Sequence, residues 1–168
     1  YLPHDIMSVC IIMGSASDKA VAEKATKLLK QLGVPFEVHV CSAHRTPDDL
    51  RELVGGSAAK VYIAIAGLSA ALPGAVAAHT LRPVIGVPVS GKVNMDSILS
   101  VVQMPPGIPV GAVGLDRGEN AALLAAQVLA VSDPAVEEAL KGHREGMAGK
   151  VRADSGAVSA ELGGGSGK

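Results

Sequence analysis

Two short segments of this chain contain the side chains best suited to chemistry. The first, Met13-Gly-Ser-Ala-Ser-Asp18, offers hydroxyls and a carboxylate, and the second, Cys41-Ser-Ala-His-Arg-Thr-Pro47, offers an imidazole and a guanidinium. An imidazole changes its charge near neutral pH and can move a proton, whereas a guanidinium binds phosphate or carboxylate through paired donors. The combination suggests a phosphorylated sugar bound beside a proton-transfer group.

The first segment allows two interpretations. Gly14 would let the backbone approach a ligand, and Ser15, Ser17 and Asp18 follow where a helix is expected to start. Free N–H groups at a helix start favour phosphate, and a carboxylate there favours a sugar diol. Plain helix capping by Ser17 or Asp18 explains the same residues equally well.

In the second segment, His44 and Arg45 are adjacent, so their side chains must diverge or flank one ligand. Such a pair in a loop is more often solvated than functional, but a position directly after a strand favours a site. Cys41 could be a nucleophile; a small buried residue at a strand end is the favoured interpretation.

The third segment, Ala66 to Gly74, has almost no charge and offers backbone N–H groups and apolar walls. These suit a planar heterocycle or carbon dioxide. A tight joint between strand and helix, packed on small residues, explains the segment about equally well.

The elements that must position these segments alternate along the chain. Short apolar runs predict strands at 8–13, 36–40, 61–66, 83–87 and 110–114. Helical spacing and capping signals predict helices at 17–32, 47–54 with Thr46 as N-cap, 70–80, 96–102, 119–131 and 134–150.

This alternation predicts an α/β fold: a single-domain, three-layer α/β/α sandwich with a doubly wound parallel sheet, flavodoxin- or Rossmann-like. Right-handed crossovers bring the loops after parallel strands to one edge of the sheet. The loops at 14–18, 41–47, 67–74 and 88–94 should therefore converge, and the default site is a crevice between them.

Composition narrows the class of protein. The chain has 168 residues, 48% of them apolar, and a net charge of −1, which fits one globular domain and gives no electrostatic case for nucleic acid or membrane surfaces. Aromatic residues make up only 2%, so base-stacking platforms are not expected. No apolar run is long enough for a membrane span. Two cysteines without a disulfide framework indicate a reducing cytoplasm.

The ends are set apart from the catalytic α/β domain, which we expect at residues 7–150. Residues 1–6 precede a natural start at Met7 and are interpreted as a vector remnant. Residues 151–168 are expected to form a flexible tail, whose last six residues have the composition of a linker or tag scar.

Several spaced motifs resemble the PurE family, whose members form carboxyaminoimidazole ribonucleotide in purine biosynthesis. The motifs are, in order, Gly14 to Asp18, Ser42 to Pro47, Pro83 to Val89, Gln103 to Val110 and Asn120 to Gln127. The resemblance runs from Met7 to about Leu140. It implies a cytoplasmic homo-octamer with active sites where subunits meet, and no metal or other cofactor.

The resemblance also assigns roles by position. His44 matches the family's proton shuttle and is the expected catalytic residue. The first motif matches phosphate- and ribose-binding residues, and the second adds phosphate contacts. The substrate-binding residues expected in this chain are Ser15, Ser17, Asp18, Ser42, Arg45, Gly67, Leu68, Ser69 and Leu72.

Two activities occur in the family. A mutase would convert N5-carboxyaminoimidazole ribonucleotide to 4-carboxy-5-aminoimidazole ribonucleotide, and this is the expected function. Mutases usually carry histidine at the position of Ala71, whereas carboxylases often have a serine followed by a non-histidine, as at Ser69 and Ala71. Direct carboxylation of 5-aminoimidazole ribonucleotide by carbon dioxide is the alternative, and a non-catalytic nucleotide-binding domain is a further one.

Overall fold

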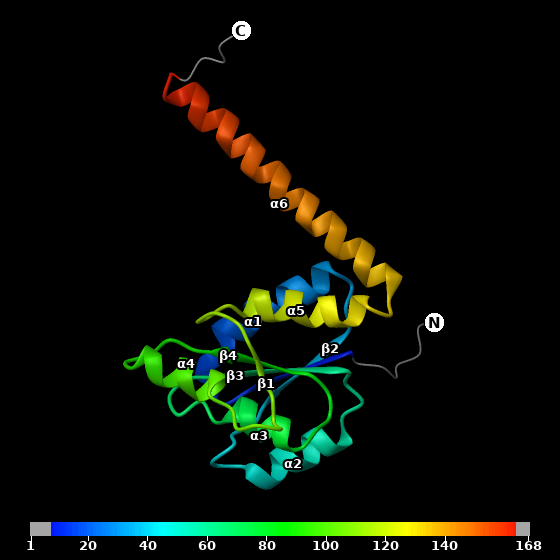
Figure 1. Cartoon of the computed structure of the whole chain (residues 1–168), viewed down its shortest axis with the longest axis vertical. Helices are drawn as coiled ribbons and strands as arrows, with labels where there is room; N and C mark the ends of the chain where they lie inside the picture. Colours follow the sequence, from blue (N-terminus) through cyan, green and yellow to red (C-terminus); the bar gives the residue numbers. More distant parts are fainter. Residues whose placement is uncertain (1–7, 164–168) are drawn as a thin grey trace.

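The computed structural model describes residues 8–163 and contains a five-stranded, all-parallel sheet (Figure 1). The strand order is β2-β1-β3-β4-β5, which is the order of a flavodoxin-like sheet. The strands are β1 (Val9–Met13), β2 (Phe36–Val40), β3 (Val61–Ala66), β4 (Val84–Pro88) and β5 (Gly111–Ala112). The predicted doubly wound α/β fold is confirmed.

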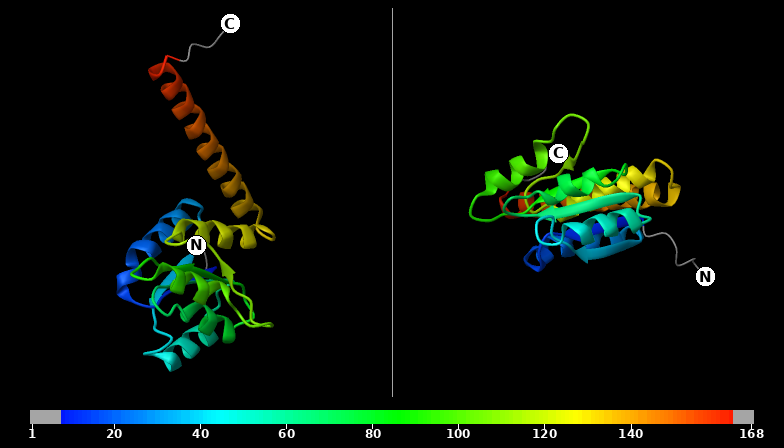
Figure 2. Two further views of the ribbon diagram at one scale, coloured as in Figure 1. Left: turned by 60° about the vertical axis from the view of Figure 1, so that its left-hand side comes forward. Right: turned by 90° about the horizontal axis from the view of Figure 1, so that it is seen from below.

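Helices cover both faces of the sheet and complete the three predicted layers (Figures 1 and 2). One face packs against α1 (Lys19–Gln31), α5 (Gly118–Ala130) and the first turns of α6 (Pro134–Glu161). The other packs against α2 (Pro47–Gly56), α3 (Leu72–Ala78) and α4 (Asn94–Val102). Alternate residues of β1 enter the two cores, with Ile11 on the first face and Cys10 and Ile12 on the second.

Several element boundaries differ from the prediction. Strand β5 has two exposed residues rather than five, in a segment whose neighbouring prolines cannot donate backbone hydrogen bonds to a ladder. Helix α2 continues through Gly55 and Gly56, α3 begins only at Leu72, and α4 begins already at Asn94.

Thr46 is the N-cap residue of α2, as predicted, but its side chain makes no capping hydrogen bond to the helix. Its Oγ1 accepts a hydrogen bond from the Ser42 N–H at 3.0 Å and donates one to the Ser42 carbonyl at 3.2 Å. The threonine hydroxyl therefore closes the preceding loop, and Pro47 occupies the first position of α2, where a missing N–H costs no helical hydrogen bond.

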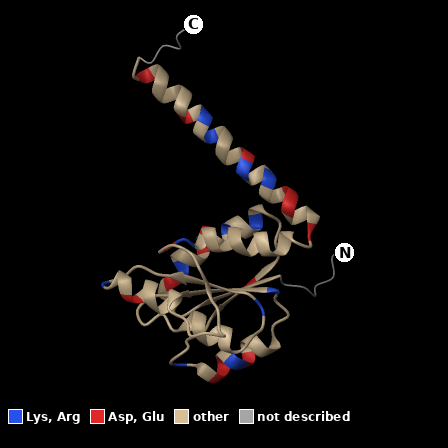
Figure 3. Cartoon of the chain, in the orientation of Figure 1, with Lys and Arg blue, Asp and Glu red and all other residues tan. Residues whose placement is uncertain are grey.

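Helix α6 runs to Glu161, past the expected helix end at 150, and its outer part projects away from the body (Figures 1 and 2). Only Val136 of this helix is buried. Lys, Arg, Asp and Glu alternate along it without a block of one sign (Figure 3). Within residues 8–163, no helix is both long and apolar enough to cross a bilayer. The expected vector remnant and residues 164–168 lie outside the described part.

Candidate active site

Three loops enclose a cavity of about 380 Å³ at the carboxyl ends of β1, β2 and β3. The chain winds from β1 outward in one direction to β2 and in the other to β3, so this is the topological switch point of the sheet. All ten side chains or backbones singled out from the sequence line it, and Gly14, Ala43 and Ala66 complete the wall. The ten are Ser15, Ser17, Asp18, Ser42, His44, Arg45, Gly67, Leu68, Ser69 and Leu72.

The first loop is held by a capping box around the 3-10 turn η1 (Ala16–Asp18). The Ser15 N–H donates to Asp18 Oδ2 at 3.1 Å, and the Ser17 N–H donates to Ser15 Oγ at 3.3 Å. The Ser17 hydroxyl donates to Asp18 Oδ1 at 3.4 Å. The capping residue is thus Ser15 with Asp18 as its partner, on the 3-10 turn; neither Ser17 nor Asp18 caps α1 through its side chain, and all three residues line the cavity.

Asp18 is the one buried acidic residue of the cavity wall, with 7% of its surface exposed. Burial raises the pKa of its carboxyl above the ordinary value, while the bonds from Ser15 and Ser17 act in the opposite direction. A carboxylate fixed in this way keeps its acceptor oxygens in one place. It is suited to a hydroxyl pair on a ligand.

In the second loop, Arg45 ties the two polar segments together. Its Nε donates to Ser42 Oγ at 3.2 Å, and its Nη2 donates to the Gly14 carbonyl at 3.0 Å, across to the first loop. His44 is exposed, and no other described residue hydrogen-bonds its ring. The imidazole is therefore available to a ligand in the cavity.

The third loop carries a backbone feature that the sequence did not predict. Ser69 has a φ of 49°, in the left-handed region, and its N–H donates to Asp96 Oδ2 at 3.0 Å. Asp96 lies in the first turn of α4, 27 positions further along the chain. Nothing local in the sequence links it to this loop, and only the packing of α4 brings it there.

The fourth predicted loop, residues 88–94, does not line the cavity. The cavity lies at the switch point between β1 and β3, and β4 lies on the far side of β3. The loop after β4 therefore emerges at the same edge of the sheet but one strand away from the cavity. Its contact is indirect: Val89 packs near Gly67, which does line the cavity.

Two residues near the third loop also lie outside the cavity wall. Ala71 precedes α3 and is exposed. His79 ends α3 and lines a separate, larger groove of about 1010 Å³ beside β4 and β5, at the other end of that helix from Ala71. That groove contains none of the predicted site residues.

Both cysteines are free and buried, and neither lines the cavity. Cys41 lies against Thr46, with its Sγ 3.5 Å from the threonine Oγ1, which agrees with the favoured interpretation as a packed strand-end residue. Burial, with the nearby charge of Glu37, raises the pKa of the Cys10 thiol to about 12. Cys10 is therefore no candidate for a free nucleophile.

The fold and the cavity together define an α/β protein with a cavity at the switch point of a parallel sheet. Residues 8–150 match the model of the AIR carboxylase family, and the chain belongs to that family. The sequence resemblance is thereby confirmed.

Named relatives share most of the chain. The N5-carboxyaminoimidazole ribonucleotide mutase of Methanocaldococcus jannaschii is 58% identical over 86% of this chain and 93% of its own length. A probable enzyme of the same name from Methanobrevibacter smithii is 52% identical over 85% of this chain, which spans only 43% of that protein. The crystal structure of Treponema denticola PurE superposes with a TM-score of 0.81 at 32% identity, covering 89% of this chain and 96% of that one.

Proposed function

We propose that this protein is an N5-carboxyaminoimidazole ribonucleotide mutase of de novo purine biosynthesis. The observation that carries the proposal is the cavity at the switch point, which combines an unbonded imidazole, a buried carboxylate and a guanidinium from two neighbouring loops. The name of the Methanocaldococcus relative supports the same activity.

In this proposal the substrate's sugar and phosphate bind between the first two loops. Asp18 accepts from the ribose hydroxyls, because its oxygens are fixed by the capping box. Arg45, with the hydroxyls of Ser15, Ser17 and Ser42, binds the phosphate through charge-assisted hydrogen bonds. The aminoimidazole ring then reaches the third loop, where Gly67, Leu68, Ser69 and Leu72 offer backbone groups and apolar surface.

His44 is proposed as the single acid and base of the reaction. As the carbamate N–C bond breaks, the imidazolium gives its proton to the exocyclic nitrogen and carbon dioxide is released. Carbon 4 of the ring then attacks carbon dioxide, and the neutral imidazole takes the proton from that carbon. The proton lost in the first step is recovered in the second, so the enzyme returns to its starting state.

Replacement of His44 by Asn tests this role. We expect kcat to fall by about 10²–10⁴-fold, as for loss of a general acid and base, with little change in substrate affinity. Steady-state kinetics and calorimetric binding measure the two quantities. His79→Asn is the matched control, since that histidine lies outside the cavity. Turnover of His44→Asn within a few-fold of wild type would exclude the mechanism.

Ala71, in place of the histidine usual in mutases, makes direct carboxylation the second candidate. Side-by-side assays with the carbamate substrate, and with 5-aminoimidazole ribonucleotide plus bicarbonate, distinguish the two. A mutase turns over the carbamate rapidly at low bicarbonate, and a carboxylase does not. Ligand binding without turnover of either substrate would favour a non-catalytic nucleotide-binding domain.

We further propose a cytoplasmic homo-octamer whose catalytic domain spans residues 7–150. The two free thiols fit a reducing compartment, and the family match over 8–150 fits the domain boundary. Exposed apolar side chains along α6 support association between copies of the chain. They are Met147, Val151, Val158 and Leu162 just past its end, which we call the α6 stripe.

A further inference from the structure

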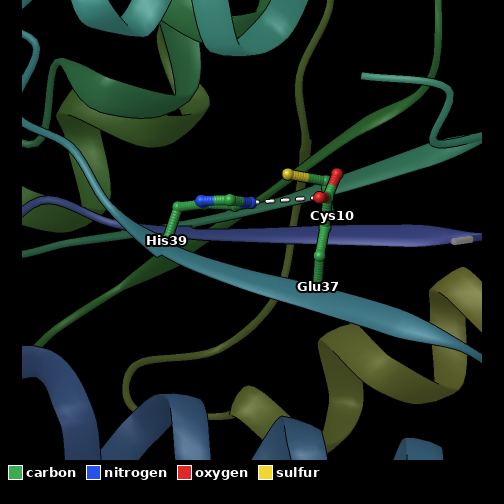
Figure 4. Close-up of side chains that lie close together, drawn as sticks. All are labelled: Cys10, Glu37 and His39. Carbon is green, nitrogen blue, oxygen red and sulfur yellow. Dashed lines mark hydrogen bonds and ion pairs between the residues drawn. The ribbon is translucent and has the colours of Figure 1, made fainter. Parts of the chain in front are cut away.

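A second group of reactive side chains lies away from the cavity, on the face of the sheet that α2 covers. Cys10 of β1 and Glu37 and His39 of β2 each offer one atom, the Sγ, a carboxylate oxygen and a ring nitrogen, and these atoms all lie within 4.8 Å of one another (Figure 4). None of the three residues lines the proposed active site. They therefore need an explanation of their own.

The strand register brings the three together. Cys10 is paired with Glu37, and Ile12 with His39, so alternate residues of two neighbouring strands point to the same side. Figure 4 shows the His39 ring directed toward the Glu37 carboxylate, and the distance from Nε2 to Oε2 is 3.1 Å. The arrangement is thus built into regular strands rather than into a loop.

A fourth residue orients the carboxylate. The hydroxyl of Ser57, at the C-terminal end of α2, donates to Glu37 Oε1 at 2.6 Å. This bond leaves Oε2 as the oxygen that faces His39. In metal centres, such outer hydrogen bonds fix the orientation of a ligating carboxylate.

We propose that Cys10, Glu37 and His39 bind one divalent transition-metal ion of the zinc class, with water at a fourth position. A thiolate, an imidazole and a carboxylate form a donor set that zinc accepts and that magnesium and calcium do not favour. Ligand atoms around tetrahedral zinc lie about 3.3–3.7 Å apart, a spacing that falls inside the 4.8 Å limit of the cluster and close to the 3.1 Å between His39 Nε2 and Glu37 Oε2, so small side-chain rotations suffice.

Access and role follow from the position of the cluster. Cys10 is fully buried, whereas the His39 side chain is 36% exposed on β2, an edge strand of the sheet. The ion therefore enters from the solvent side, takes the place of the thiol proton and bridges β1 to β2. Its expected role is structural, because it ties the edge strand to the centre of the sheet.

Cobalt titration of the full-length apoprotein is the test. We expect one Co²⁺ per chain, a near-ultraviolet sulfur-to-cobalt charge-transfer band, visible bands of tetrahedral cobalt, and loss of all of them on adding Zn²⁺. Cys10→Ser should abolish the charge-transfer band, and the control Cys41→Ser should keep it. Absence of the band in the wild type, or its survival in Cys10→Ser, overturns the proposal.

Cys10→Ser alters a buried position and could misfold, so variants of the partly exposed residues of the cluster provide a second test. His39→Gln should weaken Co²⁺ binding at least about 10-fold and Ser57→Ala about 10-fold, while His79→Gln should leave it unchanged. Zn²⁺ should raise the Tm of the wild type and have no such effect on His39→Gln. Equal affinities for the wild type and His39→Gln would mean that the cluster is only an ion pair beside a buried thiol.

Discussion

At the scale of single residues, individual side chains of the cavity have two roles: they hold a loop in place and they present a functional group to a ligand. Asp18 holds the first loop and presents a carboxylate, and Arg45 joins two loops and presents a guanidinium. The His44 ring makes no hydrogen bond to other described residues. Substitutions in this group should therefore separate binding, stability and turnover.

Arg45→Ala is expected to act mainly on binding. A charge-assisted contact contributes about 1.5–3 kcal/mol, so the substrate Kd should rise by about 10–150-fold. Calorimetric titration of substrate measures the change. Arg51→Ala removes an arginine paired with Asp48 on α2, outside the cavity, and should leave the Kd unaltered. An unchanged Kd in Arg45→Ala would rule out the phosphate contact.

Asp18→Asn should weaken substrate binding and change the pH dependence of stability. Because burial raises the pKa of Asp18 in the folded state, protonation favours folding, and the free energy of unfolding falls as the pH rises above the ordinary Asp range. The variant lacks this carboxyl, so its free energy of unfolding should decline less between pH 4 and pH 7 than that of the wild type. It should also bind substrate more weakly. Denaturant unfolding at both pH values measures the pH dependence.

The exposed carboxylate of Asp154 on α6 supplies the control for that experiment. Asp154→Asn should reproduce the pH dependence of the wild type. If Asp18→Asn shows the same pH dependence as the wild type, the buried carboxyl does not contribute in this direction.

At the scale of elements, two glycines allow neighbouring elements to approach closely. Gly118 begins α5 against α1, and a Cβ there would lie 2.1 Å from the carbonyl oxygen of Val21. A second tight position is Gly86 in β4, where a Cβ would lie 2.5 Å from Val101. Glycine therefore lets α5 approach α1 within one layer and lets β4 approach α4.

Gly118→Ala should destabilise the protein by about 3 kcal/mol, because the clash is with backbone that cannot rotate away. Gly142→Ala is the matched change on α6, where a Cβ meets nothing within 4 Å. It should stabilise by about 0.5–1 kcal/mol through helix propensity. Thermal and denaturant unfolding compare the two, and equal effects would contradict the packing argument.

The sequence predicted most of the strands and helices, and it missed the features that depend on packing between distant parts of the chain. The buried run Val61 to Ala66 was predicted to the residue, because β-branched residues without polar alternation mark a central parallel strand. Asp96 and the left-handed Ser69 were not predicted, since their contact joins a loop to the first turn of a helix 27 positions further along the chain. The short β5 was overestimated because Val110 to Gly114 has strand-like residues without a ladder partner for most of them.

At the scale of the whole molecule, α6 is a long arm with little of its surface covered. Residues of the α6 stripe repeat at spacings of four, seven and four along the chain, so they share one side of the helix. Isolated exposed apolar residues are common, but an aligned set on a projecting helix favours a second copy of this chain as partner.

Val151→Lys combined with Val158→Lys should break this association. We expect light scattering to give about 135 kDa for the wild type, eight times 16.9 kDa, and a smaller mass for the variant. The control is Ala153→Lys combined with Ala160→Lys, which adds the same charges on the opposite side of the helix. A smaller mass for both variants, or for neither, would exclude the α6 stripe as the contact.

The order of the loops along the chain also determines how the site is encoded. Every residue that lines the cavity lies in the segment from Gly14 to Leu72, which is less than half of the chain. A break in the exposed loop at Gly91 and Lys92 would leave the entire wall on one fragment. The other fragment would carry Asp96, α5 and α6, so recovery of activity on mixing the two would report assembly rather than the repair of a divided site.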